Sequence, residues 1–170
     1  MRLFIALPVP ATLRRNIGEV QTALKNKGVR ARFVPQENLH LTLCFLGSVK
    51  DPEPAEEAIR SVSLPKTALR FERLTLFGDV TAALFQPDAA LESYVRNLRH
   101  ALDEAGLAYD KQTFRPHVTL ARKTALPCPG CKLSPFEKPL RGARLPVKEV
   151  QLTASDLSGG TPKYTVIFKQ

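Results

Sequence analysis

Long apolar runs are missing from this 170-residue sequence, and cysteine is scarce. No stretch approaches the roughly 20 apolar residues that span a bilayer, and the first apolar run, Leu3 to Leu7, is too short for the apolar part of a secretory signal. The three cysteines, Cys44, Cys128 and Cys131, are an odd number at spacings that no disulfide framework uses, which indicates a reducing compartment. We therefore expect a cytoplasmic protein that does not bind membranes.

Acidic residues are also in deficit, with 16 Asp and Glu against 25 Lys and Arg and a formal net charge of +9. A surface of this sign attracts polyanions, and nucleic acid is the obvious candidate, although net charge alone specifies no partner. The length fits one domain, residues 1–170, that is large enough to bury a core.

Histidine occurs only three times, and two of the three lie in copies of one four-residue pattern, His40-Leu41-Thr42-Leu43 and His117-Val118-Thr119-Leu120. Alternate residues of a β-strand share a face, so each His and Thr would lie on one face and the aliphatic residues on the other. Two such strands side by side would bring two imidazoles and two hydroxyls to one cleft.

The two histidine patterns belong to a longer internal repeat. An amphipathic helix is predicted by the stripe Leu13, Ile17, Val20 and Leu24 and would end at Gly28. The same pattern recurs 78 residues later, with the stripe Leu91, Val95, Leu98 and Leu102 and a glycine stop at Gly106. His117 follows His40 by 77 residues. Each half thus contains strand, helix, connecting segment and His-x-Thr strand. Two lobes related by a pseudo-two-fold axis would bring the equivalent strands together.

The remaining segments complete an α+β pattern. The sequence predicts a short helix within 51–62, strands at 69–77, 147–154 and 164–169, and a proline-rich surface loop at 125–146. We therefore expect a bilobal, duplicated α+β fold with antiparallel strands lining a central cleft and helices outside.

Two opposed histidines can move protons in both directions near neutral pH. One imidazole can deprotonate a nucleophile while the other protonates a leaving group, which suits in-line displacement at phosphorus. The threonine hydroxyls would donate to the non-bridging phosphate oxygens. This chemistry requires no metal or other cofactor.

The paired motifs identify a resemblance to a known family. The segments Asn38 to Gly47, Arg115 to Arg122 and Arg2 to Ala6 resemble the two-histidine (2H) phosphoesterase superfamily, and within it the bacterial and archaeal RNA 2′,3′-cyclic phosphodiesterases, also named 2′-5′ RNA ligases. The resemblance covers essentially the whole chain. It implies a single domain made of two intertwined lobes, with two antiparallel sheets facing a positively charged groove.

The resemblance also implies a reaction, the metal-independent hydrolysis of a terminal 2′,3′-cyclic phosphate on RNA to a 2′-phosphate. By motif order, His40 would protonate the leaving 3′ oxygen and His117 would take a proton from water. Thr42 and Thr119 would bind phosphate oxygens. The expected partners are RNA ends or nucleotides that bear a 2′,3′-cyclic phosphate, and the expected state is a monomer.

Two residues five positions after the histidines are further candidates. Arg122 is out of phase with the histidine face in an ideal strand, yet at the strand end it could bend toward phosphate. Phe45 could stack on an RNA base, but a place in the core is the stronger expectation. Basic clusters could follow an RNA backbone or be ordinary solvated charge; they are Arg30 and Arg32, Arg70 and Arg73, and Arg141, Arg144 and Lys148.

Two other features receive structural interpretations. His100, one position off the helical stripe and without a threonine partner, is expected to face solvent. Cys128 and Cys131 have zinc-knuckle spacing, but His40 and His117 would have to leave a cleft to join them, so a zinc site is disfavoured.

Two alternative functions use the same residues. The first is RNA ligation to a 2′-5′ linkage, the reverse reaction with a 5′-hydroxyl in place of water. The second is a non-catalytic RNA-binding module with a basic groove.

Overall fold

The computed structural model describes all residues, 1–170, and contains three α-helices and one large antiparallel sheet. The helices are α1 (Ala11–Asn26), α2 (Glu53–Ser61) and α3 (Ala89–Glu104), with short 3-10 turns η1 (Gln36–Asn38), η2 (Ser134–Phe136) and η3 (Lys138–Leu140). The strands are β1 (Arg2–Pro8), β2 (Arg30–Phe33), β3 (His40–Ser48), β4 (Ala68–Phe77), β5 (Val80–Phe85), β6 (His117–Ala125), β7 (Arg144–Pro146), β8 (Gln151–Asp156) and β9 (Lys163–Lys169). The α+β class expected from the sequence is confirmed.

The strands form two similar halves that meet at one pair of residues. The strand order is β7-β4-β5-β6-β3-β1-β8-β9, with β2 on β6. The two halves, β6-β5-β4-β7 and β3-β1-β8-β9, are joined where Leu41 of β3 pairs with Val118 of β6. These two residues are equivalent in the repeat, so the pseudo-two-fold axis passes between them. The two sheets expected from the resemblance are thus connected into one.

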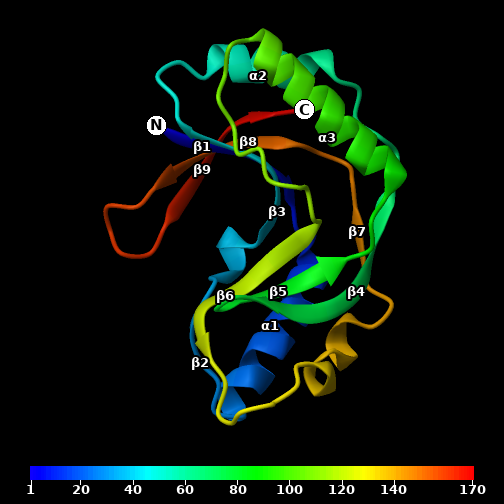
Figure 1. The fold of residues 1–170 in the computed structure, drawn as a ribbon, viewed down its shortest axis with the longest axis vertical. Helices are drawn as coiled ribbons and strands as arrows, with labels where there is room; N and C mark the ends of the chain where they lie inside the picture. Colours follow the sequence, from blue (N-terminus) through cyan, green and yellow to red (C-terminus); the bar gives the residue numbers. More distant parts are fainter.

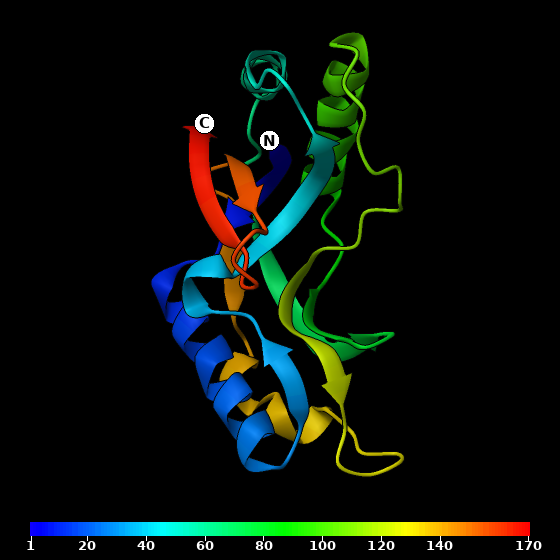
Figure 2. The same cartoon turned by 90° about the vertical axis from the view of Figure 1, so that its left-hand side faces the viewer.

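Chain segments cross between the halves. Strand β4 follows β3 in the chain but pairs with β5, and β8 follows β7 but pairs with β1. The helices cross as well, since α1 follows β1 but contacts β6, and α3 follows β5 but contacts β3. In Figure 1, α2 and α3 accordingly lie together at the top and α1 at the bottom. Figure 2 shows the same separation from the side.

The two long helices form where the repeat predicts them. Every residue of both apolar stripes is at most 3 % exposed. The Asp88 carboxylate caps α3 by accepting from the Leu91 N–H at 2.8 Å. Gly28 and Gly106 follow the helices with φ of +91° and +67°, a region that favours glycine, and thus end both helices as expected.

Other predicted boundaries need correction. The strand expected at 147–154 begins only at Gln151, and Val147 and Val150 are buried outside any strand. The stretch 125–146 is not a simple surface loop, because it contains η2, η3 and β7. Leu140 and Leu145 are fully buried there, and η3 packs on α1. The apolar side chains of Leu140 and Leu145 therefore belong to the core beside α1.

The cysteines also differ from expectation. Cys128 and Cys131 are joined by a disulfide, whereas Cys44 is buried and free. The sequence argument for three reduced cysteines is therefore wrong for this pair, because a two-residue Pro-Gly turn brings the thiols together locally.

No helix is both long and apolar enough to cross a membrane.

Because one continuous core of 36 buried residues spans both halves, we expect the chain to unfold in a single transition. Leu41→Ala removes a fully buried side chain at the junction and should lower the free energy of unfolding by about 2–5 kcal/mol, measured by urea denaturation. Leu157→Ala, at a side chain 49 % exposed, is the control and should change little. Two separate transitions, or equal effects of both variants, would contradict the shared core.

Candidate active site

The two histidine motifs lie on adjacent antiparallel strands, β3 and β6. His40, Thr42, His117 and Thr119 are half-buried, while Leu41, Leu43, Val118 and Leu120 between and after them are buried. The alternation expected from the sequence is therefore present. The Leu41–Val118 pair sets an antiparallel register in which His40 lies opposite Thr119 and Thr42 opposite His117. Each imidazole consequently has the other motif's threonine as its neighbour across the strands.

Both imidazoles are oriented by the same backbone contact. His40 Nδ1 lies 2.7 Å from the Asn38 carbonyl oxygen, and His117 Nδ1 lies 2.7 Å from the Arg115 carbonyl oxygen. A carbonyl oxygen can only accept, so each Nδ1 carries the proton and donates. In the neutral tautomer the Nε2 atom of each ring is then the free base, and it is the atom available for proton transfer.

The surroundings of the two histidines differ. His40 packs against the Phe4 ring at a centroid distance of 4.7 Å and meets Tyr164 edge-on at 5.4 Å. His117 has one aromatic neighbour, Phe77, at 5.2 Å. The Arg115 guanidinium lies over that same Phe77 ring at 4.7 Å. His40 is thus enclosed on two sides, and His117 is more open.

Enclosure changes the proton affinity of His40. Burial lowers the pKa of its imidazole, because the charged form loses hydration. The hydrogen bond to the Asn38 carbonyl raises this pKa in part, and the positive charges of Arg122 and His117 lower it further. The protonated form of His40 is therefore a stronger acid than an ordinary imidazolium.

A bulge in each motif strand turns the fifth residue after the histidine to the histidine face. The β6 register with β5 shifts between Thr81 and Ala82, so Leu120 and Ala121 are both buried and Arg122 emerges beside Thr119. The expectation that Arg122 is out of phase is therefore wrong. The signal available in the sequence was the consecutive apolar pair Leu120-Ala121, which interrupts the alternation.

The same bulge in β3 corrects the expectation for Phe45. The register with β1 shifts between Ile5 and Ala6, so Leu43 and Cys44 are both buried and Phe45 is turned outward. Phe45 is 36 % exposed rather than part of the core. Its ring is parallel to that of Phe4 at a centroid distance of 6.2 Å, with the Arg2 guanidinium 5.6 Å from its centre.

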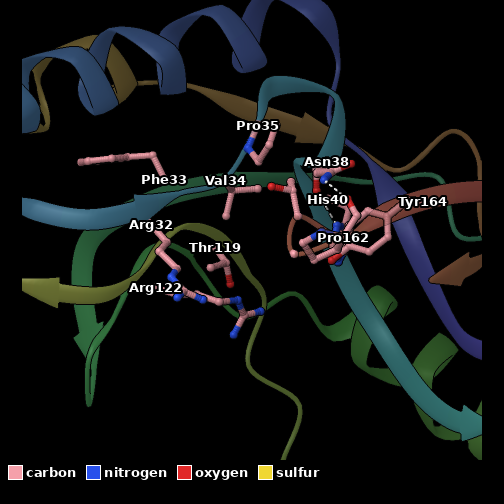
Figure 3. Close-up of a pocket in the computed structure, with 12 residues that line it drawn as sticks. Arg32, Phe33, Val34, Pro35, Asn38, His40, Thr119, Arg122, Pro162 and Tyr164 are labelled. Atoms are coloured by element: carbon pink, nitrogen blue, oxygen red, sulfur yellow. Dashed lines mark hydrogen bonds between the residues drawn. The ribbon is translucent and has the colours of Figure 1, made fainter. Parts of the chain in front are cut away.

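A cavity of about 540 Å³ opens on this surface (Figure 3). His40 and Thr119 line it from the two motif strands, and Tyr164 and Pro162 close it beside His40. Arg32 and Arg122 lie on the opposite side. His117, Thr42 and Phe45 share the strand face but do not line this cavity.

Asn38 and Tyr164 are among the cavity residues that sequence reasoning missed. Asn38 is buried, its carbonyl holds His40, and its Nδ2 donates to the Pro162 carbonyl at 2.8 Å. Tyr164 comes from β9, more than 120 residues after His40 in the chain. Burial raises the pKa of the Tyr164 hydroxyl, so it remains a neutral hydrogen-bond donor. No local pattern marks Tyr164, because only the pairing of β9 with β8 places it there.

The other candidate residues lie elsewhere. Of the basic clusters only Arg32 lines the cavity, since Arg70 pairs with Arg144 across β4 and β7, and Arg73 contacts Glu72 at 2.9 Å. His100 is exposed, as expected, and lies 3.4 Å from Glu104. The thiols of Cys128 and Cys131 are bonded to each other and so offer no thiolate pair to a zinc ion.

The environment of His40 predicts its titration. In an NMR pH titration, His40 should lose its proton below the ordinary value of 6.5. Arg122→Gln should raise the pKa of His40, because loss of a nearby positive charge favours the imidazolium. Arg30→Gln, which removes the same charge outside the cavity, should leave the pKa of His40 unchanged. A pKa of His40 that falls in Arg122→Gln would contradict the assigned contact.

Comparison with known proteins agrees with this arrangement. A family described as LigT-like phosphoesterase matches the chain twice, over residues 7–83 and 84–164. An RNA 2′,3′-cyclic phosphodiesterase of Thermus thermophilus is 32 % identical over 189 residues, covering 99 % of this chain and 89 % of the relative. One of Escherichia coli is 30 % identical over 178 residues, covering 96 % and 92 %.

Solved structures give the same result. A Thermus thermophilus protein superposes with a TM-score of 0.79 at 28 % identity, covering 99 % of this chain and 96 % of that one. Escherichia coli LigT complexed with 3′-AMP superposes with a TM-score of 0.76 at 26 % identity, covering 99 % and 95 %. The double match of the family mirrors the repeat of strand, helix and histidine motif. The chain therefore belongs to the LigT-like phosphoesterase family.

Proposed function

We propose that this protein hydrolyses the 2′,3′-cyclic phosphate at an RNA end to a 2′-phosphate, with His40 and His117 as its acid and base. The observation that carries the proposal is the paired orientation of the imidazoles. Each donates Nδ1–H to a carbonyl 2.7 Å away and leaves Nε2 for proton transfer on one shared strand face. The relatives named RNA 2′,3′-cyclic phosphodiesterase support this choice of substrate.

In the proposed reaction, water attacks phosphorus and the bond between phosphorus and O3′ breaks. His117 accepts the proton of the attacking water at Nε2, and the protonated His40 donates its Nε2 proton to O3′. The phosphate then remains on O2′. Because burial lowers the pKa of His40, its imidazole holds a proton less firmly than an ordinary histidine does. The negative charge of a bound phosphate would favour the protonated form that this step needs.

Three side chains would stabilise the phosphate as charge develops on its oxygens. Thr42 and Thr119 would donate from their hydroxyls, and Arg122 would provide a guanidinium from the edge of the cavity. Phe45 would stack on the terminal base, because its exposed ring lies on the strand face that carries His40. RNA ends and nucleotides with a 2′,3′-cyclic phosphate are therefore the proposed substrates.

The direct test is incubation with adenosine 2′,3′-cyclic phosphate and identification of the adenosine phosphate produced. His40→Ala and His117→Ala should each lower kcat by about 10²- to 10⁴-fold, because each removes a proton-transfer group. His100→Ala, at an exposed histidine that lies 3.4 Å from Glu104, is the matched control and should retain activity. Wild-type turnover in either motif variant would refute the mechanism.

Since two imidazoles supply both proton transfers, activity should not depend on a metal ion. Dialysis against EDTA should leave kcat and KM unchanged, measured with the same cyclic phosphate. A loss that is restored by stoichiometric zinc would show that a metal takes part and would reject this proposal.

A further inference from the structure

The cavity contains a second arginine that the proposed mechanism does not use. Arg32 of β2 is the direct cross-strand partner of Arg122 of β6. Like charges placed opposite each other on neighbouring strands repel and destabilise a sheet. Neither guanidinium takes part in an ion pair, and no Asp or Glu lines the cavity. Both side chains are exposed, so water and dissolved ions screen part of this repulsion, and an anion bound between the two guanidinium groups would relieve the rest.

One cyclic phosphate does not account for both arginines. A 2′,3′-cyclic phosphate carries a single negative charge, which Arg122 can match beside Thr119 and the histidines. Figure 3 shows Arg32 beyond Arg122 as seen from His40. Arg32 thus lies away from the position of the reacting phosphate, at the far end of the same cavity.

The remainder of the cavity suits a nucleoside. Its volume of about 540 Å³ lies within the roughly 300–1,000 Å³ usual for small-molecule sites. Val34 lines the cavity next to Arg32, whereas the Phe33 ring points away from it and lies under the Lys25 ammonium group of α1. A sugar and part of its base could therefore bridge the two charged ends of the cavity.

We propose that the Arg32 guanidinium binds a second phosphate, the one on the 5′ oxygen of the nucleoside that carries the cyclic phosphate. In a nucleoside whose O2′ and O3′ are both esterified, O5′ is the hydroxyl position of the ribose left for a further phosphate. Arginine is well suited to this contact, because its planar fork binds phosphate oxygens in pairs. The inference rests on the proposed function and specifies its substrate as a nucleotide that carries phosphate on the 5′ oxygen as well as the 2′,3′-cyclic phosphate.

The test compares three substrates at fixed ionic strength: adenosine 2′,3′-cyclic phosphate, its 5′-phosphorylated form, and a dinucleotide that ends in the cyclic phosphate. For the wild-type protein, a 5′ phosphate should raise kcat/KM by about tenfold or more, chiefly through KM. Arg32→Gln should abolish this advantage. Arg30→Gln removes the same charge from the same strand outside the cavity and should preserve it.

The outcomes separate the two proposals. If none of the three compounds is hydrolysed, the proposed function fails. If all three are hydrolysed with equal kcat/KM, or if the advantage survives in Arg32→Gln, the second phosphate site is refuted. An advantage that depends on Arg32 and is limited to the dinucleotide supports the site with RNA as the source of the phosphate. An Arg32-dependent advantage that the 5′-phosphorylated mononucleotide also shows supports the site, with free nucleotides as a further source of the phosphate.

Discussion

The pairing of Leu41 with Val118 is the contact on which the rest of this structure depends. Both side chains are completely buried, and they occupy equivalent positions in the two repeats. Because side chains alternate along a strand, burial of this pair places His40, Thr42, His117 and Thr119 on the opposite face. A slip of one residue in the register would send the polar groups into the core, so core burial and site geometry constrain each other.

The two halves of the site differ because the duplication is imperfect. The backbone contacts of the two histidines are the same, but the first lies between Phe4 and Tyr164 and the second beside Phe77 alone. Different surroundings give two otherwise similar groups different proton affinities. The residue that follows each bulge also differs, because it is an aromatic ring at Phe45 and a cation at Arg122. The two motif strands thus share one face but present different side chains at equivalent positions.

Much of the fold followed from local patterns. The apolar stripes of α1 and α3, the glycines that end them, and the alternation in both motif strands are properties of short segments, and the structure contains them all. The bulges were missed because a bulge is defined by the register with a neighbouring strand. Leu43-Cys44 and Leu120-Ala121 become intelligible only when β1 and β5 are seen beside them. The buried stretch after β6 was misjudged for a similar reason, because its apolar residues pack on α1 from far away in the chain.

The amino-acid sequence is enough to identify the polar groups of the candidate site, namely two histidines and two threonines in phase on strands of a duplicated chain. Spacing along a strand is a local property, and a repeat is visible without any contact. The residues that enclose these four groups become known from the folded chain alone. Strands β4 and β8 cross to the opposite half, β9 brings Tyr164 to His40, and β2 brings Arg32 to Arg122. These neighbours are set by strand pairing between distant segments, which no local pattern encodes.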